Sequence, residues 1–183
     1  MKYKTLYLDP PWLERGGGKI KRGADKHYEL MHTKDILELL KKDIVPLLDD
    51  NCHMYMWVTN NFLKDGLWLI EQLGFQYITT ITWMKDKIGL GQYYRGLTEH
   101  CLFARKGMLP YKEQNGKRLQ GVTGFIERKQ EHSRKPYRMR KMIEGVSHEP
   151  RLEVFSREKV AGWDCYGNET EKYKTNTLMG YKK

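Results

Sequence analysis

The chain has 183 residues, which is enough for one domain with a proper hydrophobic core and little more. Its formal net charge of +10 shows that the protein is basic and favours an anionic partner. Nucleic acid is the more strongly favoured partner, before an anionic membrane. A solvated basic surface is the alternative explanation of that charge.

Several other classes of protein are excluded by local features. No apolar run is long enough to span a bilayer, and Met1 leads directly into strand-like residues rather than into a signal peptide. Cys52, Cys101 and Cys165 are odd in number, far apart and without CxxC spacing, so we expect neither a disulfide nor a metal site. The sequence thus predicts a cytoplasmic protein without a membrane partner, in which Cys52 and Cys101 are buried by packing.

The first predicted strand covers residues 2–9 and ends at the turn Asp-Pro-Pro-Trp (9–12). Thr33 is the expected N-cap of a helix, because apolar residues recur at helical spacing from there to residue 48. Pro46 is expected to end or bend that helix.

A second strand is predicted over residues 52–60, and Asn60 or Asn61 is expected to cap a helix that runs through Leu73. Gly74 is well placed to end this helix.

The second half continues the alternation. Residues 75–85 are β-branched and aromatic, which favours a strand, and residues 100–105 predict another. A helix is expected after Pro136 and a fifth strand over 151–156. This order predicts an α/β fold over residues 1–169, followed by a basic, flexible tail at 170–183.

Positive charge is concentrated in one window of the sequence. Residues 105–141 carry 12 Lys and Arg against 3 Asp and Glu, which is 12 − 3 = +9 of the total charge. Because the same window contains loop-like, glycine-bearing sequence, residues 105–135 predict a basic loop that grips a phosphate backbone. A solvated insertion is the alternative. The expected backbone contacts are Lys117, Arg118, Arg128 and Lys129.

The turn Asp9-Pro10-Pro11-Trp12 carries the most specific chemistry. It follows a strand of an α/β sheet, and ligands bind at the carboxyl ends of such strands. Each proline fixes φ and removes an amide donor, which predicts carbonyl groups that are unpaired and point outward. A carboxylate beside a fixed carbonyl can accept both hydrogens of one amino group, and the Trp12 ring offers a stacking face for a base.

These groups suit the exocyclic amine of a nucleobase. That nitrogen is a poor nucleophile, because its lone pair is delocalised into the ring. Two acceptors on its hydrogens favour a pyramidal nitrogen, and holding it in line with an activated methyl group supplies most of the acceleration. Asp9 is then the expected proton acceptor, directly or through water. A rigid structural turn is the alternative for a motif this short.

Further blocks follow in order along nearly the whole chain, and together they resemble the MT-A70 family of S-adenosylmethionine-dependent adenine-N6 methyltransferases. The resemblance is to its short bacterial and phage members. The blocks are DPPW (9–12), HYELM (27–31), MYMWVTN (54–60), ITTITWMK (78–85), GLGQYYRGLTEHCLFARKG (89–107), HSRKP (132–136) and LEVFSREKVAGWDCYGNE (152–169). The family's pattern has a proline at the position of His27. The resemblance implies a Rossmann-like sheet in permuted order, with the catalytic block first and the cofactor blocks towards the C-terminus.

The resemblance also implies roles for individual residues. Residues 9–12 would form the catalytic turn; Tyr28, Trp83 and Glu99 would line the base pocket. S-adenosylmethionine would be held by Asp9, Lys135, Arg157, Asn168 and Glu169. Core packing is the alternative for Tyr28 and Trp83, a turn asparagine for Asn168, and support of the following loop for Arg157.

Two departures from the family's pattern bear on the donor site. No G-x-G-x-x-G loop follows the first strand, and the acidic donor contact that longer members carry upstream has no counterpart here. A homodimer, or a heterodimer with a related subunit, would supply what is missing.

We therefore expect adenine methylation in nucleic acid, with DNA favoured and RNA as the alternative. Cytosine-N4 methylation uses the same kind of turn, and the flanking blocks favour adenine over it. A catalytically silent, nucleic-acid-binding subunit is the alternative from another class; the intact acid of the DPPW turn and the retained GNE (167–169) argue against it.

Overall fold

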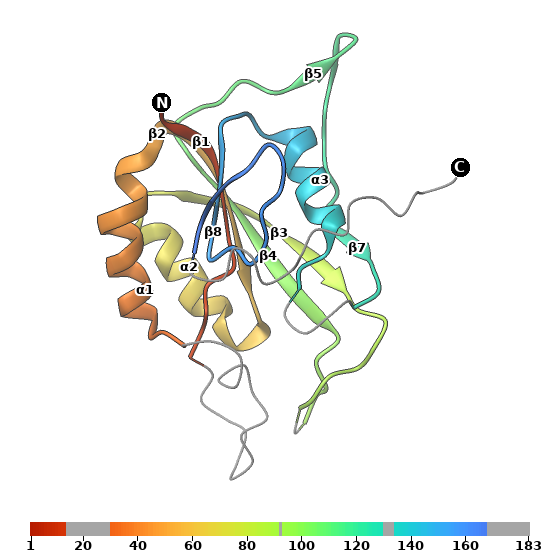
Figure 1. Cartoon of the computed structure of the whole chain (residues 1–183). Helices are drawn as coiled ribbons and strands as arrows, with labels where there is room; N and C mark the ends of the chain where they lie inside the picture. Colours follow the sequence, from red (N-terminus) through yellow and green to blue (C-terminus); the bar gives the residue numbers. More distant parts are fainter. Residues whose placement is uncertain (14–29, 92, 130–133, 168–183) are drawn as a thin grey trace.

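A computed structural model describes residues 1–13, 30–91, 93–129 and 134–167 (Figure 1). In this part of the chain a seven-stranded sheet has the order β7-β3-β4-β2-β1-β8-β9, and a separate two-stranded hairpin pairs β5 with β6. The strands are β1 (Tyr3–Leu8), β2 (Leu48–Val58), β3 (Gln76–Met84), β4 (Thr98–Lys106), β5 (Glu113–Gln114), β6 (Lys117–Arg118), β7 (Gly124–Ile126), β8 (Arg151–Val154) and β9 (Asp164–Tyr166). The α-helices are α1 (Thr33–Leu39), α2 (Leu63–Gln72) and α3 (Tyr137–Val146).

The direction of the strands places several chain ends at one edge of the sheet. β1 is an inner strand and is parallel to both of its neighbours, β2 and β8, while β4 is antiparallel to β2 and β3. The carboxyl ends of β1, β2, β3 and β8 therefore meet the amino end of β4. Asp9 directly follows β1 at this edge, and Glu99 at the start of β4 pairs with Trp83 near the end of β3.

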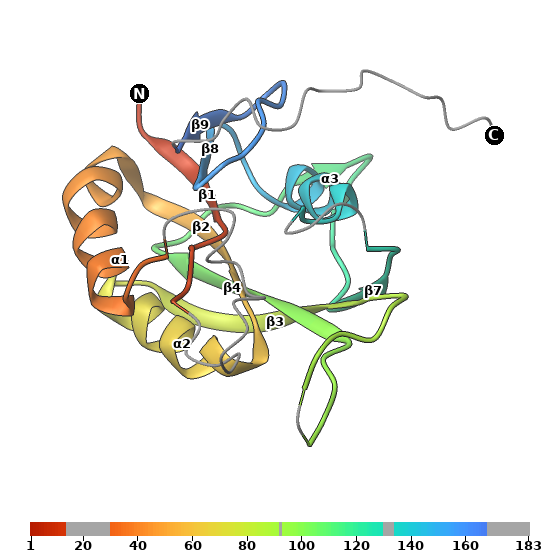
Figure 2. The same ribbon diagram turned by 60° about the horizontal axis from the view of Figure 1, so that its bottom comes forward.

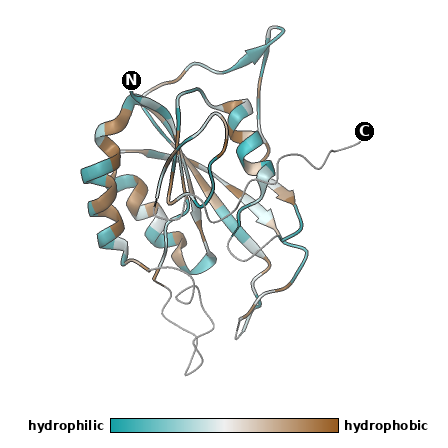
Figure 3. Cartoon of the chain, in the orientation of Figure 1, coloured by the Kyte–Doolittle hydropathy of each residue, from teal (hydrophilic) through white to brown (hydrophobic). Residues whose placement is uncertain are grey.

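Helices cover both faces of the sheet, with α1 and α2 on one face and α3 on the other (Figures 1 and 2). The alternation of side chains in β1 serves both layers, because Leu6 and Leu8 pack in one buried cluster and Tyr7 packs in the other. The α1 and α2 ribbons vary between apolar and polar along their length, as amphipathic helices with one buried side do (Figure 3). The layered α/β architecture predicted from the sequence is confirmed.

The predicted helix after residue 33 is confirmed, but its start and end differ from the prediction. His32 precedes the first turn, while the Thr33 hydroxyl donates to Asp65 Oδ1 at 2.8 Å instead of capping the helix. After α1 the chain continues as a π-helical turn over Leu40–Ile44 and a 3-10 turn over Val45–Leu47, which contains Pro46. Pro46 therefore lies in the last helical turn before β2, as its missing amide donor requires.

The second helix starts differently from the prediction as well. Residues 60–62 form a 3-10 turn after Thr59, and Asn60 directs its side-chain oxygen to within 2.8 Å of His100 Nε2. At the other end the prediction is confirmed, because Gly74 has φ of +77° and its N–H donates to the Glu71 carbonyl. The buried positions of Cys52 and Cys101 are confirmed too.

The short strands β5, β6, β7 and β9 were not predicted. They have two or three residues each, which is too short for a periodic pattern to be visible. Among the helices that the structure describes, none has the length and apolar character needed to cross a membrane.

Candidate active site

The Asp-Pro-Pro-Trp turn is tightly tied to the rest of the fold. The Pro10 carbonyl accepts the N–H of Trp12 at 2.9 Å, and the Pro11 carbonyl accepts the N–H of Met31 at 2.8 Å. The prediction that these carbonyl groups are unpaired is therefore wrong. Because a carbonyl oxygen has two lone pairs, each can still accept one more hydrogen bond.

The buried side chain of Trp12 fixes the turn to the core. Its ring is only 6% exposed and stacks on Phe62 with centroids 5.1 Å apart, and its indole N–H donates to the Trp57 carbonyl at 3.1 Å. This arrangement replaces the expected open stacking face for a base, because one face of the ring already lies against Phe62. Trp12 thus holds the Asp9 backbone in place rather than presenting a platform.

Asp9 belongs to a cluster of four charged side chains at the carboxyl edge. Lys135, just before α3, places its Nζ 2.9 Å from Asp9 Oδ2 and 3.2 Å from Glu99 Oε2. Glu99 also pairs with Lys85, which directly follows β3. The structure therefore brings Asp9, Glu99 and Lys135 together, as the sequence led us to expect, and it adds Lys85.

The charges of this cluster have a clear effect on Glu99. Burial alone would raise its pKa, but the positive charges and hydrogen bonds of Lys135 and Lys85 outweigh burial and lower the pKa to about 2. Glu99 is therefore ionised at neutral pH, and it contacts both lysines, of which Lys135 also contacts Asp9.

This pKa predicts a pH-dependent contribution to stability. Ionised Glu99 stabilises the folded state above pH 4.5, its ordinary value, and this contribution is lost as the pH falls towards 2. In urea unfolding at a series of pH values, we expect Glu99→Gln to be less stable than wild type by about 2 kcal/mol at pH 6 and by almost nothing near pH 2. A pH-independent difference would show that packing of Glu99, and not its charge, matters.

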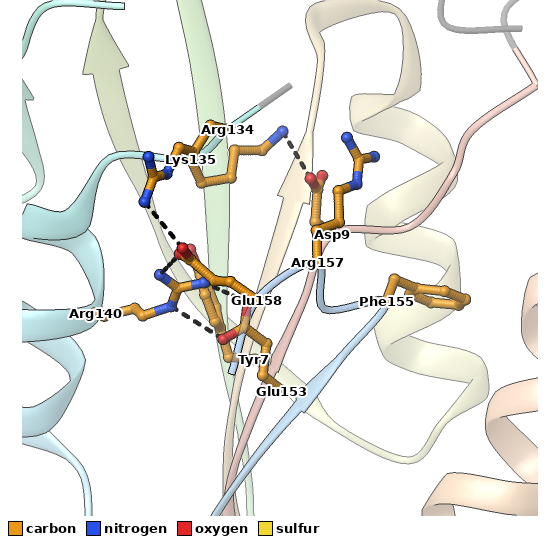
Figure 4. A pocket seen from close by; sticks show the side chains of 9 residues that line it. All are labelled: Tyr7, Asp9, Arg134, Lys135, Arg140, Glu153, Phe155, Arg157 and Glu158. Atoms are coloured by element: carbon orange, nitrogen blue, oxygen red, sulfur yellow. Dashed lines mark hydrogen bonds and ion pairs between the residues drawn. The ribbon is translucent and has the colours of Figure 1, made fainter. Parts of the chain in front are cut away.

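A second group of charges lines the pocket next to Asp9 (Figure 4). The Arg140 guanidinium, on α3, donates to both oxygens of Glu153 at 3.0 and 2.8 Å and to Glu158 Oε1 at 2.5 Å. Arg134 donates to the other oxygen of Glu158 at 3.0 Å. The complete lining is Tyr7, Asp9, Arg134, Lys135, Arg140, Glu153, Phe155, Arg157 and Glu158.

The other predicted site residues fall into three groups. Arg157 lines this pocket close to Asp9, whereas Trp83 is only 2% exposed and donates its indole N–H to the Glu127 carbonyl at 2.8 Å. Trp83 therefore packs in the core beneath the edge of the sheet. Tyr28, Asn168 and Glu169 lie outside the described residues.

The four predicted backbone contacts do not form one surface. Lys117 and Arg118 lie in the β5–β6 hairpin, which extends from the end of the sheet opposite to Asp9 (Figure 1). Arg128 and Lys129 follow β7 at the same edge as Asp9, where the Lys129 N–H donates to Asp86 Oδ1 at 2.8 Å. Only this second pair lies where it can contact a nucleic acid bound at Asp9.

Several pocket residues were not predicted, although the sequence carries signals for them. Arg140 is a cation next to Met139 on the buried side of α3, and Glu153 is an acid within a short apolar strand. Two opposite charges on buried faces of adjacent elements indicate a buried pair. Lys85 was hidden because its contact with Glu99 depends on the register of β3 with β4.

Comparison with known proteins places the chain in a family. A family model described as MT-A70 matches residues 3–169. The chain is 29% identical to the Type II methyltransferase M.MunI from Mycoplasma sp, over 92% of this chain and 78% of that protein. It is 27% identical to a putative N(6)-adenosine-methyltransferase MT-A70-like protein of Medicago truncatula and 24% identical to the human N(6)-adenosine-methyltransferase catalytic subunit METTL3. These alignments cover 92% and 93% of this chain but only 26% and 28% of the two relatives, so the chain spans about a quarter of their length.

The family match covers most of the chain and includes every charged residue of the cluster around Asp9. From its sequence and its fold, the chain belongs to the MT-A70 family of methyltransferases.

Proposed function

We propose that this protein transfers a methyl group from S-adenosylmethionine to the N6 amine of adenine in nucleic acid, with DNA as the favoured substrate. The observation that carries the proposal is the Asp9 carboxylate, which follows the inner strand β1 at the carboxyl edge and lies 2.9 Å from Lys135. Asp9 is the acid of the DPPW turn, at the place where α/β sheets bind their ligands.

The charged residues of the pocket fit S-adenosylmethionine. Its amino-acid end carries a carboxylate and an ammonium group, and the pocket offers Lys135, Arg134 and Arg157 for the first and acids such as Asp9 for the second. The pocket has free space of about 30 Å³, which is room for one or two water molecules. Binding therefore requires Lys135 to turn from Asp9 and Glu99 towards the donor's carboxylate. S-adenosylmethionine supplies an electrophilic methyl group at this edge of the sheet.

The protein's own groups then act on the adenine. One hydrogen of the N6 amine is accepted by the Asp9 carboxylate and the other by the second lone pair of a turn carbonyl, at Pro10 or Pro11. These two contacts orient the nitrogen for attack on the methyl carbon. As the new N–C bond forms and the S–C bond breaks, the nitrogen becomes acidic, and Asp9 accepts its proton directly or through water.

The comparisons support the choice of adenine and, more weakly, of DNA. The plant and human relatives are named as N(6)-adenosine methyltransferases. The relative that this chain covers over 78% of its length is named as a Type II methyltransferase, which is a DNA methyltransferase. Because human METTL3 is named as a catalytic subunit, the protein should be assayed both alone and mixed with related subunits.

Methyl transfer to defined oligonucleotides tests the proposal. Purified protein is incubated with S-adenosylmethionine and oligonucleotides that contain either adenine or cytosine as the only base with an exocyclic amine, as DNA and as RNA, followed by mass spectrometry of the nucleosides. We expect N6-methyldeoxyadenosine from the adenine DNA. Methylcytosine alone, or no product from any oligonucleotide, contradicts adenine methylation, and methylation of RNA only contradicts the preference for DNA.

A further inference from the structure

The connection between β3 and β4 forms an ordered hairpin that projects from the catalytic edge (Figure 2). The structure describes it at residues 85–91 and 93–97. Backbone hydrogen bonds close it at three levels, from Lys85 to Leu97 at 2.9 Å, from Gly89 to Gly96 at 2.7 Å and from Gly96 to Leu90 at 3.1 Å.

The tip of the hairpin is held in shape by its own residues. A Cβ on Gly91 would lie 1.9 Å from the Tyr94 carbonyl oxygen, so this position requires glycine. The Arg95 Nε donates to the Gly89 carbonyl at 3.0 Å. These contacts link the described residues on the two sides of the tip, which favours preorganised side chains there for a ligand.

Large apolar side chains lie at this tip with little contact to the protein. Tyr93 is 92% exposed, Tyr94 93% and Leu90 80%. Two nearly fully exposed tyrosines on an ordered backbone indicate an interaction site, because scattered exposed side chains on a solvated surface do not normally cluster in this way. A tyrosine offers a large stacking area at a low cost in conformational entropy.

The charge around the tyrosines complements an anionic partner. The hairpin carries the cations Lys87 and Arg95. Its acid, Asp86, accepts a hydrogen bond from the N–H of Lys129 at 2.8 Å and forms an ion pair with Arg128 at 3.6 Å. The hairpin is thereby joined to the basic residues that follow β7. At its root, Lys85 pairs with Glu99, which shares Lys135 with Asp9. The root of the hairpin is therefore linked by ion pairs to the charged cluster at Asp9, while Lys87 and Arg95 add positive charge to the hairpin itself.

We infer that the tip of the β3–β4 hairpin, with Tyr93 and Tyr94, stacks on the bases that flank the target adenine, while Lys87, Arg95 and Arg128 contact the phosphate backbone. This inference rests on the proposed action on nucleic acid and assigns a binding role to residues outside the pocket. Stacked bases on tyrosines hold the strand beside the site without reading its sequence, because every base has a π-face.

Binding without a methyl donor tests this inference separately from catalysis. The titration uses a single-stranded adenine oligonucleotide with 2-aminopurine as its fluorescent base. We expect the double variant Tyr93→Ser/Tyr94→Ser to bind it about 10- to 100-fold more weakly than wild type. The double variant Tyr93→Phe/Tyr94→Phe keeps the rings and should bind within about 3-fold of wild type. Tyr77→Ser removes a half-exposed tyrosine at the start of β3, far from Asp9, and should leave binding unchanged.

The outcomes separate the hairpin from the proposed function. Unchanged binding of the oligonucleotide by the serine variant overturns the inference. It is also overturned if wild-type protein sediments as a dimer and the serine variant as a monomer, because the tip is then an interface between copies. If wild type binds the oligonucleotide through the tyrosines but methylates nothing, the inference stands and the proposed reaction fails.

Discussion

Asp9→Asn is expected to lower the rate of methyl transfer by at least about 100-fold, because the amide cannot take the proton that the alkylated amine releases. The substitution keeps the size of the side chain, so the turn with its Trp12 anchor should stay folded. It also removes the charge that Lys135 contacts at 2.9 Å, while the contact of Lys135 with Glu99 remains. Affinity for the oligonucleotide should change by less than about 3-fold, since the backbone contacts lie outside the pocket.

The measurement compares single-turnover rates and oligonucleotide affinity for wild type, Asp9→Asn and Asp164→Asn. Asp164 is an exposed aspartate at the start of the edge strand β9, where it accepts a hydrogen bond from the Tyr3 hydroxyl. Its variant controls for the loss of a carboxylate in general and should react at the wild-type rate. An Asp9→Asn protein that keeps a tenth or more of the activity refutes the role of Asp9 in proton transfer. An equal loss of rate, affinity and thermal stability assigns Asp9 to the structure instead.

The position of Asp9 was predictable because all its determinants are local. A strand pattern runs directly into Asp-Pro-Pro-Trp, and the proline pair shows where the strand must end. The role of Trp12 was not predictable in this way. Its ring lies against Phe62, 50 residues further along the chain, and the parallel pairing of β1 with β2 brings together the segments that follow these two strands.

The charged residues show the same division between local and tertiary information. The net charge of residues 105–141 was visible in the sequence, but its distribution depends on topology: Lys117 and Arg118 lie at the end of the sheet opposite to Asp9, while Lys135 reaches Asp9 itself. A count of charges along a chain does not show at which edge of a sheet they lie. The direction of each strand determines that edge, and strand direction follows from pairings between distant segments.

The buried ion pairs of Arg140 with Glu153 and Glu158 join the pocket to the core, so they should contribute to the stability of the fold. The side chains of Arg140, Glu153 and Glu158 are each less than 10% exposed, and the guanidinium donates to both carboxylates. Burial would lower the pKa of Arg140, but the two acids outweigh it, raise that pKa and keep the group charged. Glu153 lies in β8, the direct neighbour of β1, so the pair fixes α3 above the strand that carries Asp9.

Arg140→Met should destabilise the protein by about 3–5 kcal/mol at neutral pH, because it leaves Glu153 charged and buried without its partner. Urea unfolding measures this loss, with Lys141→Met as the control. Lys141 is the next residue of α3 and forms an exposed pair with Glu144, which is worth about 0.5 kcal/mol or less.

The loss of stability in Arg140→Met should depend on pH. In this variant burial holds the pKa of Glu153 above its unfolded value, so the loss of stability should be largest at neutral pH and should shrink as the pH falls towards about 4.5. The double variant Arg140→Met/Glu153→Met removes the guanidinium and one of its two acids, while Glu158 keeps its pair with Arg134, and should recover much of the stability. A loss in Arg140→Met no larger than in Lys141→Met, or one that the double variant deepens, would mean that these charges do not hold α3 on the sheet.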